Sequence, residues 1–353
     1  EPMENEEQLS FLPLCHILER SVSVMFPLKS GAVVNFAESI DTVPENIREV
    51  SPTVFIAVPR IWEKFYSSIT ILMKDATFIG KYFYDISIKT GAKYKEYYIE
   101  GKQPPLMLKL SYRLCNYLVL KNIKKLLGLN KCRYALSGAA PISPELINWY
   151  LSLGIDMREG WGMTETAGVG TAFYSREIKL GHVGRAVNQS EVRIADDGEI
   201  LFKGPGVFCG YLNKPEQTKE TLIDGWLHTG DVGEMDNYGN IKITDRKKDI
   251  IITAGGKNIS PSEIENELKF SPFVSDAVVI GDKRKFLSCL IMIDEENVMK
   301  YAQDNDIPFS NFESLCKSEE VVNLIDGEVS KVNKKFASVE QVKKFSLIDI
   351  QLT

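Results

Sequence analysis

The stretch CRYALSGAAPISPELINWYLSLGIDMREGWGMTE, residues 132–165, decides the fold. It predicts a strand, a loop, a helix, a second strand and a second loop, in that order. Ser143 before Pro144 predicts where the helix begins, because serine caps helices and proline suits their first turn. Both loops, SGAAP and GWGMTET, follow the C-terminal end of a strand, where open parallel sheets bind ligands. The stretch therefore predicts an α/β fold with a binding site at these two loops.

Length and composition limit the classes of protein that fit. A chain of 353 residues is long enough for two domains. The net charge of −6, without an isolated Lys/Arg-rich stripe, argues against a nucleic-acid partner. Six widely spaced cysteines without a CxxC pair are typical of reduced thiols, so we expect a cytoplasmic protein. No signal peptide is recognised, and no apolar run reaches the ~18–20 residues of a membrane span, so we expect no transmembrane segment.

The pattern of predicted strands and helices changes at two points downstream of this stretch. Residues 181–243 contain short strands separated by glycine turns, which predicts a small antiparallel sheet or barrel. After DRKKD (Asp245–Asp249) a pattern of strands and charged helices begins. We therefore predict a domain boundary there, with residues 1–245 and 246–353 as the two domains.

A long helix is expected between Leu106 and Leu127. The leucines that step by four or eight along it are Leu106, Leu110, Leu114, Leu118 and Leu126. We expect this apolar face to pack on a core and the lysines to form a solvated face. The lysines are Lys109, Lys121, Lys124 and Lys125. The alternative is a helix that makes a peripheral contact with a membrane surface.

Three motifs place glycines, hydroxyls and charges where a backbone can approach a phosphorylated ligand. They are REGWGMTETAG (Arg158–Gly168), DGWLHTGD (Asp224–Asp231) and DRKKDIIITAGGKNISPSEIE (Asp245–Glu265). In this order they resemble the adenylate-forming acyl-CoA synthetases, and within them the long-chain fatty acyl-CoA ligases. The resemblance implies part of a large N-terminal domain, with α/β sheet layers and a small β-barrel, followed by a smaller α+β domain.

The resemblance also implies a two-step reaction on a fatty acid. ATP and the carboxylic acid give an acyl-adenylate and pyrophosphate, and the thiol of CoA then forms a thioester and releases AMP. Mg²⁺ and hydrogen-bond donors would stabilise the charge on the phosphoryl oxygens. The implied cofactors and substrates are therefore ATP, Mg²⁺, CoA and a long-chain fatty acid. Oligomerisation is left open.

The resemblance assigns roles at the nucleotide to residues of the GWGMTE motif and of the SGAAP loop before it. By motif position, Thr164 would donate to the α-phosphate and Glu165 would hold Mg²⁺. Trp161 stands where the family usually has a tyrosine that stacks on adenine, and it keeps a flat ring. The residues that the resemblance places around the nucleotide here are Ser137, Gly138, Ala139, Ala140, Gly160, Trp161 and Gly162. The alternative is an ordinary β–α turn with a capping threonine and a surface glutamate.

The two later motifs supply the remaining implied residues. Asp231 would accept both ribose hydroxyls, since a carboxylate has two oxygens for a vicinal diol. Arg246 would reach the ribose or α-phosphate and take part in catalysis with Thr164 and Glu165. Lys248 would be the hinge about which the small domain turns between the two half-reactions.

The AGGK segment would line the tunnel for the pantetheine arm of CoA, through Gly255, Gly256 and Lys257. Ser260 or Ser262 is expected to cap a helix that starts near Pro261. His16, in LPLCHILER, would line the acyl pocket. A lone histidine in an apolar stretch is just as well a core residue.

Two family segments find no match here: the Ser/Thr/Gly-rich phosphate loop and a late lysine segment. We therefore expect a truncated member whose full activity is doubtful. Two further functions stay open: an acyl- or aryl-adenylating relative that loads a carrier protein, and a catalytically inactive adenylate-binding module.

Overall fold

The computed structural model describes residues 6–173, 178–187 and 189–349. Within these residues the chain forms two compact units. The first contains the described residues of Glu1–Phe65, Leu72–Thr229 and Gly233–Ile243. The second contains those of Tyr66–Ile71, Gly230–Val232 and Thr244–Thr353. The end of the predicted C-terminal domain, residues 350–353, lies outside the described residues.

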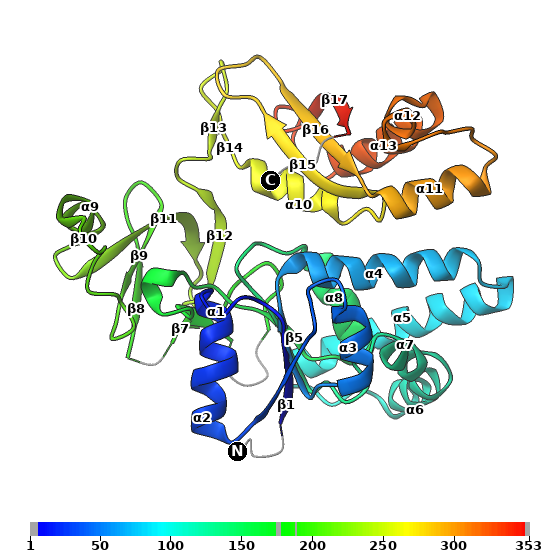
Figure 1. The fold of residues 1–353 in the computed structure, drawn as a ribbon, viewed down its shortest axis with the longest axis horizontal. Coiled ribbons are helices and arrows are strands. Elements are labelled where there is room, and N and C mark those ends of the chain that lie inside the picture. Colours follow the sequence, from blue (N-terminus) through cyan, green and yellow to red (C-terminus); the bar gives the residue numbers. More distant parts are fainter. Residues whose placement is uncertain (1–5, 174–177, 188, 350–353) are drawn as a thin grey trace. The chain divides into compact units, whose positions relative to one another are not determined.

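A parallel sheet of three strands positions the two predicted loops (Figure 1). Its order is β3 (Val54–Ala57), β4 (Tyr134–Ser137) and β5 (Met157–Glu159). The β-branched and apolar residues of β3 favour an extended chain, and Pro59 then begins helix α4 (Pro59–Lys74). This confirms the predicted α/β fold.

Aromatic packing joins this sheet to its helices in the first unit. The ring of Phe55 on β3 lies edge-on to Trp62, with 5.2 Å between centroids, and Trp62 lies 5.0 Å from Tyr150. The Tyr150 hydroxyl donates to the carbonyl oxygen of Trp62 at 2.7 Å. Burial of three such rings, each worth about 1.5–3 kcal/mol, makes this cluster a main source of stability. Tyr150 is on α8 (Pro144–Ser152).

The N-terminal segment adds a second, smaller parallel pair, β1 (Glu7–Ser10) with β2 (Val33–Phe36). Between them the chain is helical, and one turn of it is a π-helix. The helical segments here and before β3 are α1 (Ile17–Arg20), the π turn Ser21–Met25, α2 (Phe26–Ser30) and α3 (Val43–Val50).

A helical hairpin occupies the segment between α4 and β4. Helix α5 (Phe78–Ile99) packs against α6 (Leu106–Cys115), which continues through a π-helical turn, Asn116–Leu120, into α7 (Lys121–Leu126). In Figure 1 these helices are cyan to teal and lie side by side. Gly91 of α5 allows close contact with α8, since a Cβ there would lie 2.0 Å from the Ser152 oxygen.

The long helix is confirmed, but its predicted packing is wrong. The side that contacts the rest of the unit carries Leu120, Ile123 and Leu127, which are buried. The leucines of the predicted core face are instead exposed: Leu106, Leu110, Leu114, Leu118 and Leu126. The helix therefore has two apolar sides, and periodicity alone selected the wrong one.

The predicted small β region is also confirmed. Strand β11 (Trp226–Met235) pairs with β9, β10 and β12, and β9 pairs antiparallel with β8. Its core contains Val183, Ile200 and Phe202. The other elements of this region are β6 (Thr171–Ala172), β7 (Arg185–Ala186), β8 (Glu191–Ile194), β9 (Glu199–Lys203), α9 (Pro215–Thr221), β10 (Leu222–Ile223) and β12 (Ile241–Arg246).

The second unit is built on a sheet of order β15-β16-β17 with its own apolar core. Strands β15 (Val274–Ile280) and β16 (Leu287–Ile293) are antiparallel, and β17 (Val342–Ile348) is parallel to β16. The other elements are β13 (Ile251–Ile252), β14 (Asn258–Ile259), α10 (Pro261–Lys269), α11 (Glu295–Asp304), α12 (Phe312–Lys317) and α13 (Glu319–Asn333). The predicted strand and helix pattern after DRKKD is confirmed.

Candidate active site

The loops after β4 and β5 lie together, as predicted. The backbone N–H of Gly160 donates to the Ser137 oxygen at 3.0 Å, which continues the pairing of the two strands into the loops. A Cβ at Gly138 would lie 3.3 Å from the Gly160 oxygen, so the loops are nearly in contact. Ala139 has φ +70°, a conformation that favours glycine, and both Ala139 and Ala140 are exposed.

Ser137 offers an unmet polar group beside this contact. Its side chain is fully buried, and its hydroxyl oxygen has no hydrogen-bond partner within the part of the chain that the structure describes. Buried hydroxyls are normally satisfied, by protein, water or a ligand. The carboxyl end of β4 therefore has one hydrogen-bonding position available.

Trp161 is placed mainly in the core of the small β region. Its side chain is only 8% exposed, and its ring lies edge-on to Phe202 at 6.0 Å between centroids. Gly170 is needed beside it, because a Cβ there would lie 2.4 Å from the indole ring. The core position leaves little ring surface to accept an adenine, and the stacking role stays a prediction.

The rest of the GWGMTE loop is fixed by its own backbone and by one tyrosine. Thr164, in a short 3-10 turn, is exposed, whereas Glu165 is half-buried. The hydroxyl of Tyr211 donates to Glu165 Oε1 at 2.7 Å. Burial, and then this hydrogen bond, raise the pKa of Tyr211. Only glycine fits at position 162, where a Cβ would lie 2.3 Å from the Gly168 oxygen.

His16 caps a helix next to this loop. It is the N-cap of α1, and its Nδ1 accepts from the Leu18 N–H at 3.2 Å. The following turn contacts the loop, since Ser21 Oγ donates to the Ala167 oxygen at 3.3 Å. The structure thus gives the exposed His16 a structural bond, and its place in an acyl pocket stays a prediction.

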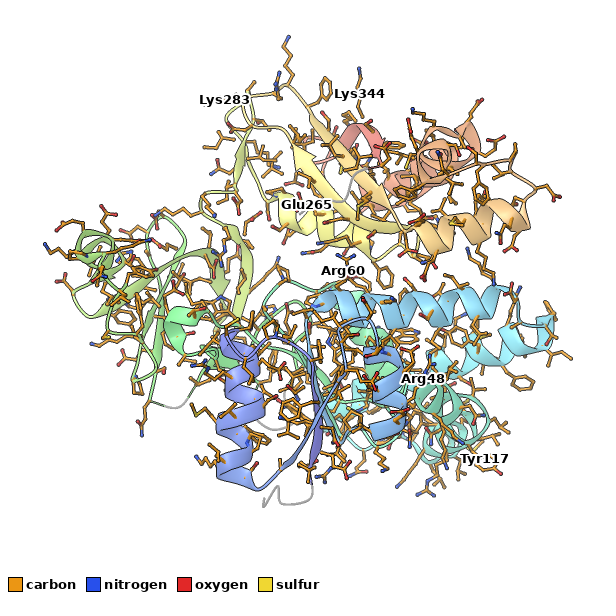
Figure 2. All side chains as sticks on the ribbon, in the orientation of Figure 1. Arg48, Arg60, Tyr117, Glu265, Lys283 and Lys344 are labelled. Carbon is orange, nitrogen blue, oxygen red and sulfur yellow. The ribbon has the colours of Figure 1, made fainter. Side chains whose placement is uncertain are left out.

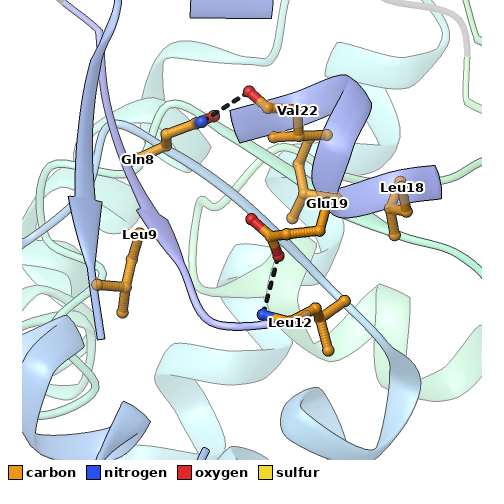
Figure 3. A pocket seen from close by; sticks show the side chains of 7 residues that line it. Gln8, Leu9, Leu12, Leu18, Glu19 and Val22 are labelled. Carbon is orange, nitrogen blue, oxygen red and sulfur yellow. Dashed lines mark hydrogen bonds between the residues drawn. The ribbon is translucent and has the colours of Figure 1, made fainter. Parts of the chain in front are cut away.

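A small cavity lies behind α1, between β1, β3 and the π turn (Figure 3). Its volume of about 10 Å³ is room for about one water molecule. Glu19 reaches across it and accepts from the Leu12 N–H at 3.0 Å, and Gln8 donates to the Val22 oxygen at 2.7 Å. The residues that line it are Gln8, Leu9, Leu12, Leu18, Glu19, Val22 and Ile56.

Glu159 is a residue at this edge that the sequence did not single out. It ends β5, directly before Gly160, and is almost fully buried. Burial raises the pKa of this carboxyl to about 8, and a hydrogen bond from the Ile142 backbone opposes the shift. Glu159 therefore joins β5 to the SGAAPIS loop as a carboxyl that stays protonated near neutral pH. Its only signal in the sequence was its position, directly before Gly160 of the GWGMTE motif.

Asp231 and Arg246 are brought together within the second unit. Nε of Arg246 lies 2.9 Å from Asp231 Oδ1, across the pairing of β11 with β12. The carboxylate is buried, with 6% of its side chain exposed, whereas the Arg246 side chain is 51% exposed. A buried carboxylate paired with a half-exposed guanidinium could accept from a diol while the arginine side chain contacts another group.

Asp245 organises the segment that follows, which the sequence did not predict. Its carboxylate accepts from Ser260 Oγ at 2.7 Å, from Ser262 Oγ at 2.9 Å and from the Ser262 N–H at 3.3 Å. The predicted start of α10 at Pro261, with Ser260 as the N-cap residue, is confirmed, but the Ser260 side chain does not make the expected cap bond. The Asp245 carboxylate instead accepts a hydrogen bond from the backbone N–H of Ser262 in the first turn of α10. Acidic groups are favourable at this end of a helix.

Lys248 lies exposed in a turn directly after β12. The turn is closed by the Asp249 N–H, which donates to the Arg246 oxygen at 2.9 Å. The neighbouring Lys247 N–H donates to the Gly230 oxygen at 2.8 Å. A short exposed turn of this kind can act as a hinge, and the hinge role of Lys248 remains a prediction.

The AGGK segment is the exposed tip of the β13–β14 hairpin. Gly256 has φ +76° with open space where a side chain would be, and Gly255 is exposed. Lys257 is not a lone cation, since its Nζ lies 3.0 Å from Glu340 Oε1. Its proposed approach to CoA would thus compete with this ion pair.

Glu165 is the residue to which the predicted Mg²⁺ site was assigned. Among the described residues there is no group of three or more His, Cys, Asp or Glu that could hold a metal ion. Glu165 offers carboxylate oxygens, one of them bonded to Tyr211. Mg²⁺ is commonly held by one or two carboxylates together with substrate phosphates, so this donor set fits that ion.

Two family models match the chain. The AMP-binding enzyme model matches residues 1–212, and the AMP-binding enzyme C-terminal domain model matches residues 248–351. The chain is 35% identical over 99% of its length to the long-chain-fatty-acid–CoA ligase FadD15 of Mycobacterium bovis, and it covers 58% of that protein. It is 33% identical over 98% of its length to the long-chain-fatty-acid–CoA ligase ACSBG2 of Gallus gallus, of which it covers 48%. The chain thus spans about half the length of these relatives.

Solved structures show the same fold at lower identity. The adenylation domain of a carboxylate reductase from Mycobacterium chelonae superposes with a TM-score of 0.68 at 21% identity, over 99% of this chain and 50% of that one. The O-succinylbenzoate coenzyme A synthetase of Bacillus subtilis, solved with ATP and magnesium, gives a TM-score of 0.62 at 23% identity, over 98% of this chain and 58% of that one.

Proposed function

The chain belongs to the AMP-binding enzyme family, and from this premise we propose that the whole protein is an ATP-dependent long-chain-fatty-acid–CoA ligase. One observation carries the proposal. The chain is 35% identical, across 99% of its length, to a protein of that name. The two neighbouring glycine loops at the carboxyl ends of β4 and β5 support it, because ligands bind at this edge of a parallel sheet.

In the first step, a carboxylate oxygen of the fatty acid attacks the α-phosphorus of ATP and pyrophosphate leaves. Asp231 accepts from the ribose hydroxyls, and Thr164 donates to an α-phosphate oxygen. Arg246 turns from Asp231 toward the ribose or α-phosphate, which its exposed side chain allows. Glu165 would hold Mg²⁺, which neutralises phosphoryl charge when bound.

In the second step, the thiol of CoA attacks the acyl carbon and AMP leaves. The exposed hairpin tip at Gly255 and Gly256 lines the path of the pantetheine arm, since it presents backbone without side chains. Lys257 flanks that path. Lys248 is the hinge between the steps, and the domain boundary lies at Asp245–Asp249.

The setting of the protein follows from the same proposal. We place it in the cytoplasm, consistent with six free thiols. Among the helices described, none is long and apolar enough to span a bilayer.

An alternative is an adenylating enzyme that loads a carrier protein. It is favoured by the fold likeness to a carboxylate reductase adenylation domain. Both activities share the first step and differ in the acceptor of the acyl group. The acceptor therefore has to be tested separately from adenylation.

The test is acid-dependent exchange of pyrophosphate into ATP by the full-length protein, with acids of increasing chain length, followed by thioester formation with CoA. Long-chain acids are expected to support both reactions. Exchange without CoA thioester would favour the carrier-protein alternative. Binding of AMP without any exchange would favour an inactive adenylate-binding module.

A further inference from the structure

The α6–α7 helix presents an apolar surface to solvent. We define the outer face as Leu106, Met107, Leu110, Leu114, Tyr117 and Leu118, all of them exposed. Leu106, Met107 and Tyr117 are 71%, 75% and 74% exposed. Figure 2 shows Tyr117 pointing away from its helix. Single exposed apolar side chains are ordinary, but a contiguous row along one helix side marks an interaction surface.

The outer face is not the side of the helix that packs against the rest of the first unit. The inner side packs against α5, where Tyr112 stacks on Tyr94 at 4.1 Å between centroids, and Leu120 is fully buried. The helix therefore carries apolar residues on two sides, and only the inner side is packed within the described residues. The outer face is left as the side that a partner would cover.

The charges around the outer face identify the partner. Between Leu106 and Leu126 the helix carries five basic residues and no acidic one, in a protein of net charge −6. Four of the five are exposed: Lys109, Arg113, Lys121 and Lys125. Basic side chains beside an apolar face bind surfaces that combine hydrocarbon with negative charge. Anionic lipid bilayers have both properties.

A second copy of the chain fits the face less well. In a two-fold contact the same patch meets itself, so the basic residues of both copies would face one another. Tyr117 also suits the water–lipid boundary, because it has an apolar ring and a polar hydroxyl. Lysine stems can lie along apolar surface while their ammonium groups stay in water.

We propose that the outer face of α6–α7 docks the protein peripherally on anionic membrane surfaces. The helix lies in the headgroup region with its leucines and tyrosine buried, and its basic residues contact lipid phosphates. The inference goes beyond the proposed function and does not rest on it, since binding to lipid requires no catalysis.

The experiment is flotation of the full-length protein with phosphatidylcholine vesicles, with and without phosphatidylglycerol. Wild-type protein should float with the anionic vesicles, less at high salt, and only weakly with neutral ones. The triple variant Lys109→Glu, Lys121→Glu and Lys125→Glu should lower the partition coefficient about 100-fold. Leu110→Ser with Leu114→Ser should also strongly reduce flotation. The binding that remains should still weaken as the salt concentration rises, because the basic residues are intact.

The matched control reverses three exposed lysines elsewhere: Lys29→Glu, Lys214→Glu and Lys334→Glu. It makes the same change in net charge and should float like wild type. Melting temperatures verify folding, and Lys109→Gln with Lys121→Gln replaces the triple variant if that one does not fold.

Three outcomes would overturn the inference. One is failure of the full-length protein to float with anionic vesicles, as when another part of the protein covers the face. Another is equal loss of flotation in the control. The last is a dimer, seen by sedimentation, that the leucine variants dissociate in a protein that binds no vesicles, because the face would then join two copies.

Discussion

Replacing Asp231 with asparagine is expected to weaken the binding of AMP specifically through its ribose. Asp231 is a buried carboxylate, and its Oδ1 is bonded to Arg246 at 2.9 Å. The proposed ribose contact uses both carboxylate oxygens as charged acceptors. Asparagine keeps the shape but has one acceptor oxygen, no charge, and an amide that only donates.

The magnitude follows from the loss of a charged acceptor. Hydrogen bonds to charged groups contribute about 1.5–3 kcal/mol, so the affinity for AMP should fall about tenfold to 150-fold. Loss of the ion pair with Arg246 should lower the free energy of unfolding by only about 0–1 kcal/mol, because the arginine is half exposed. Binding and stability should therefore respond very differently.

Calorimetry with AMP and with 2′,3′-dideoxy-AMP measures the effect. The dideoxy ligand lacks the hydroxyls and should bind wild type and Asp231→Asn about equally. Arg246→Gln removes the same ion pair but leaves the carboxylate, so it should keep the preference for AMP over the dideoxy ligand even if it lowers the affinity for both. If Asp231→Asn still discriminates against the dideoxy ligand as strongly as wild type does, Asp231 is not the ribose acceptor.

Three further predictions concern other residues. Burial raises the pKa of Glu159 from 4.5 to about 8, so the native state keeps a proton that the unfolded state releases, and the free energy of unfolding falls as pH rises between these values. In wild type the free energy of unfolding should therefore differ between pH 5 and pH 8 by an amount on the order of several kcal/mol. Glu159→Gln should remove this difference, as measured by denaturant unfolding at the two pH values. Tyr211→Phe removes the donor to Glu165, and the Mg²⁺ concentration for half-maximal adenylation should shift by up to about tenfold; an unchanged Mg²⁺ dependence would contradict the role of Glu165. Lys248→Pro fixes φ near −65° and should slow adenylation and thioester formation unequally, at an unchanged melting temperature; equal loss in both would count against the hinge.

Much of the fold could be predicted because its signals are local. Strand β3 (Val54–Ala57) consists of β-branched and apolar residues that favour an extended chain, and Pro59 then begins the next helix because proline suits a first helical turn. The two glycine loops could be placed together because parallel strands end at one edge of a sheet. In each case a short stretch of sequence carries the whole physical reason.

The side-chain partners at the site could not be predicted in the same way. Tyr211 reaches Glu165 across 46 positions, and Asp245, not a serine, receives the helix-start N–H of α10. Such pairs depend on how separate segments pack, which no local pattern contains. The pKa of Glu159 has the same origin, since burial by surrounding segments raises it.

The α6–α7 helix shows why an apolar pattern alone cannot name its partner. The pattern predicts that one side leaves water, and a protein core and a lipid bilayer satisfy that requirement equally well. What separates core from lipid is the charge beside the apolar row. A core-facing row has no need of five basic residues without one acidic residue, whereas a surface that contacts anionic headgroups does.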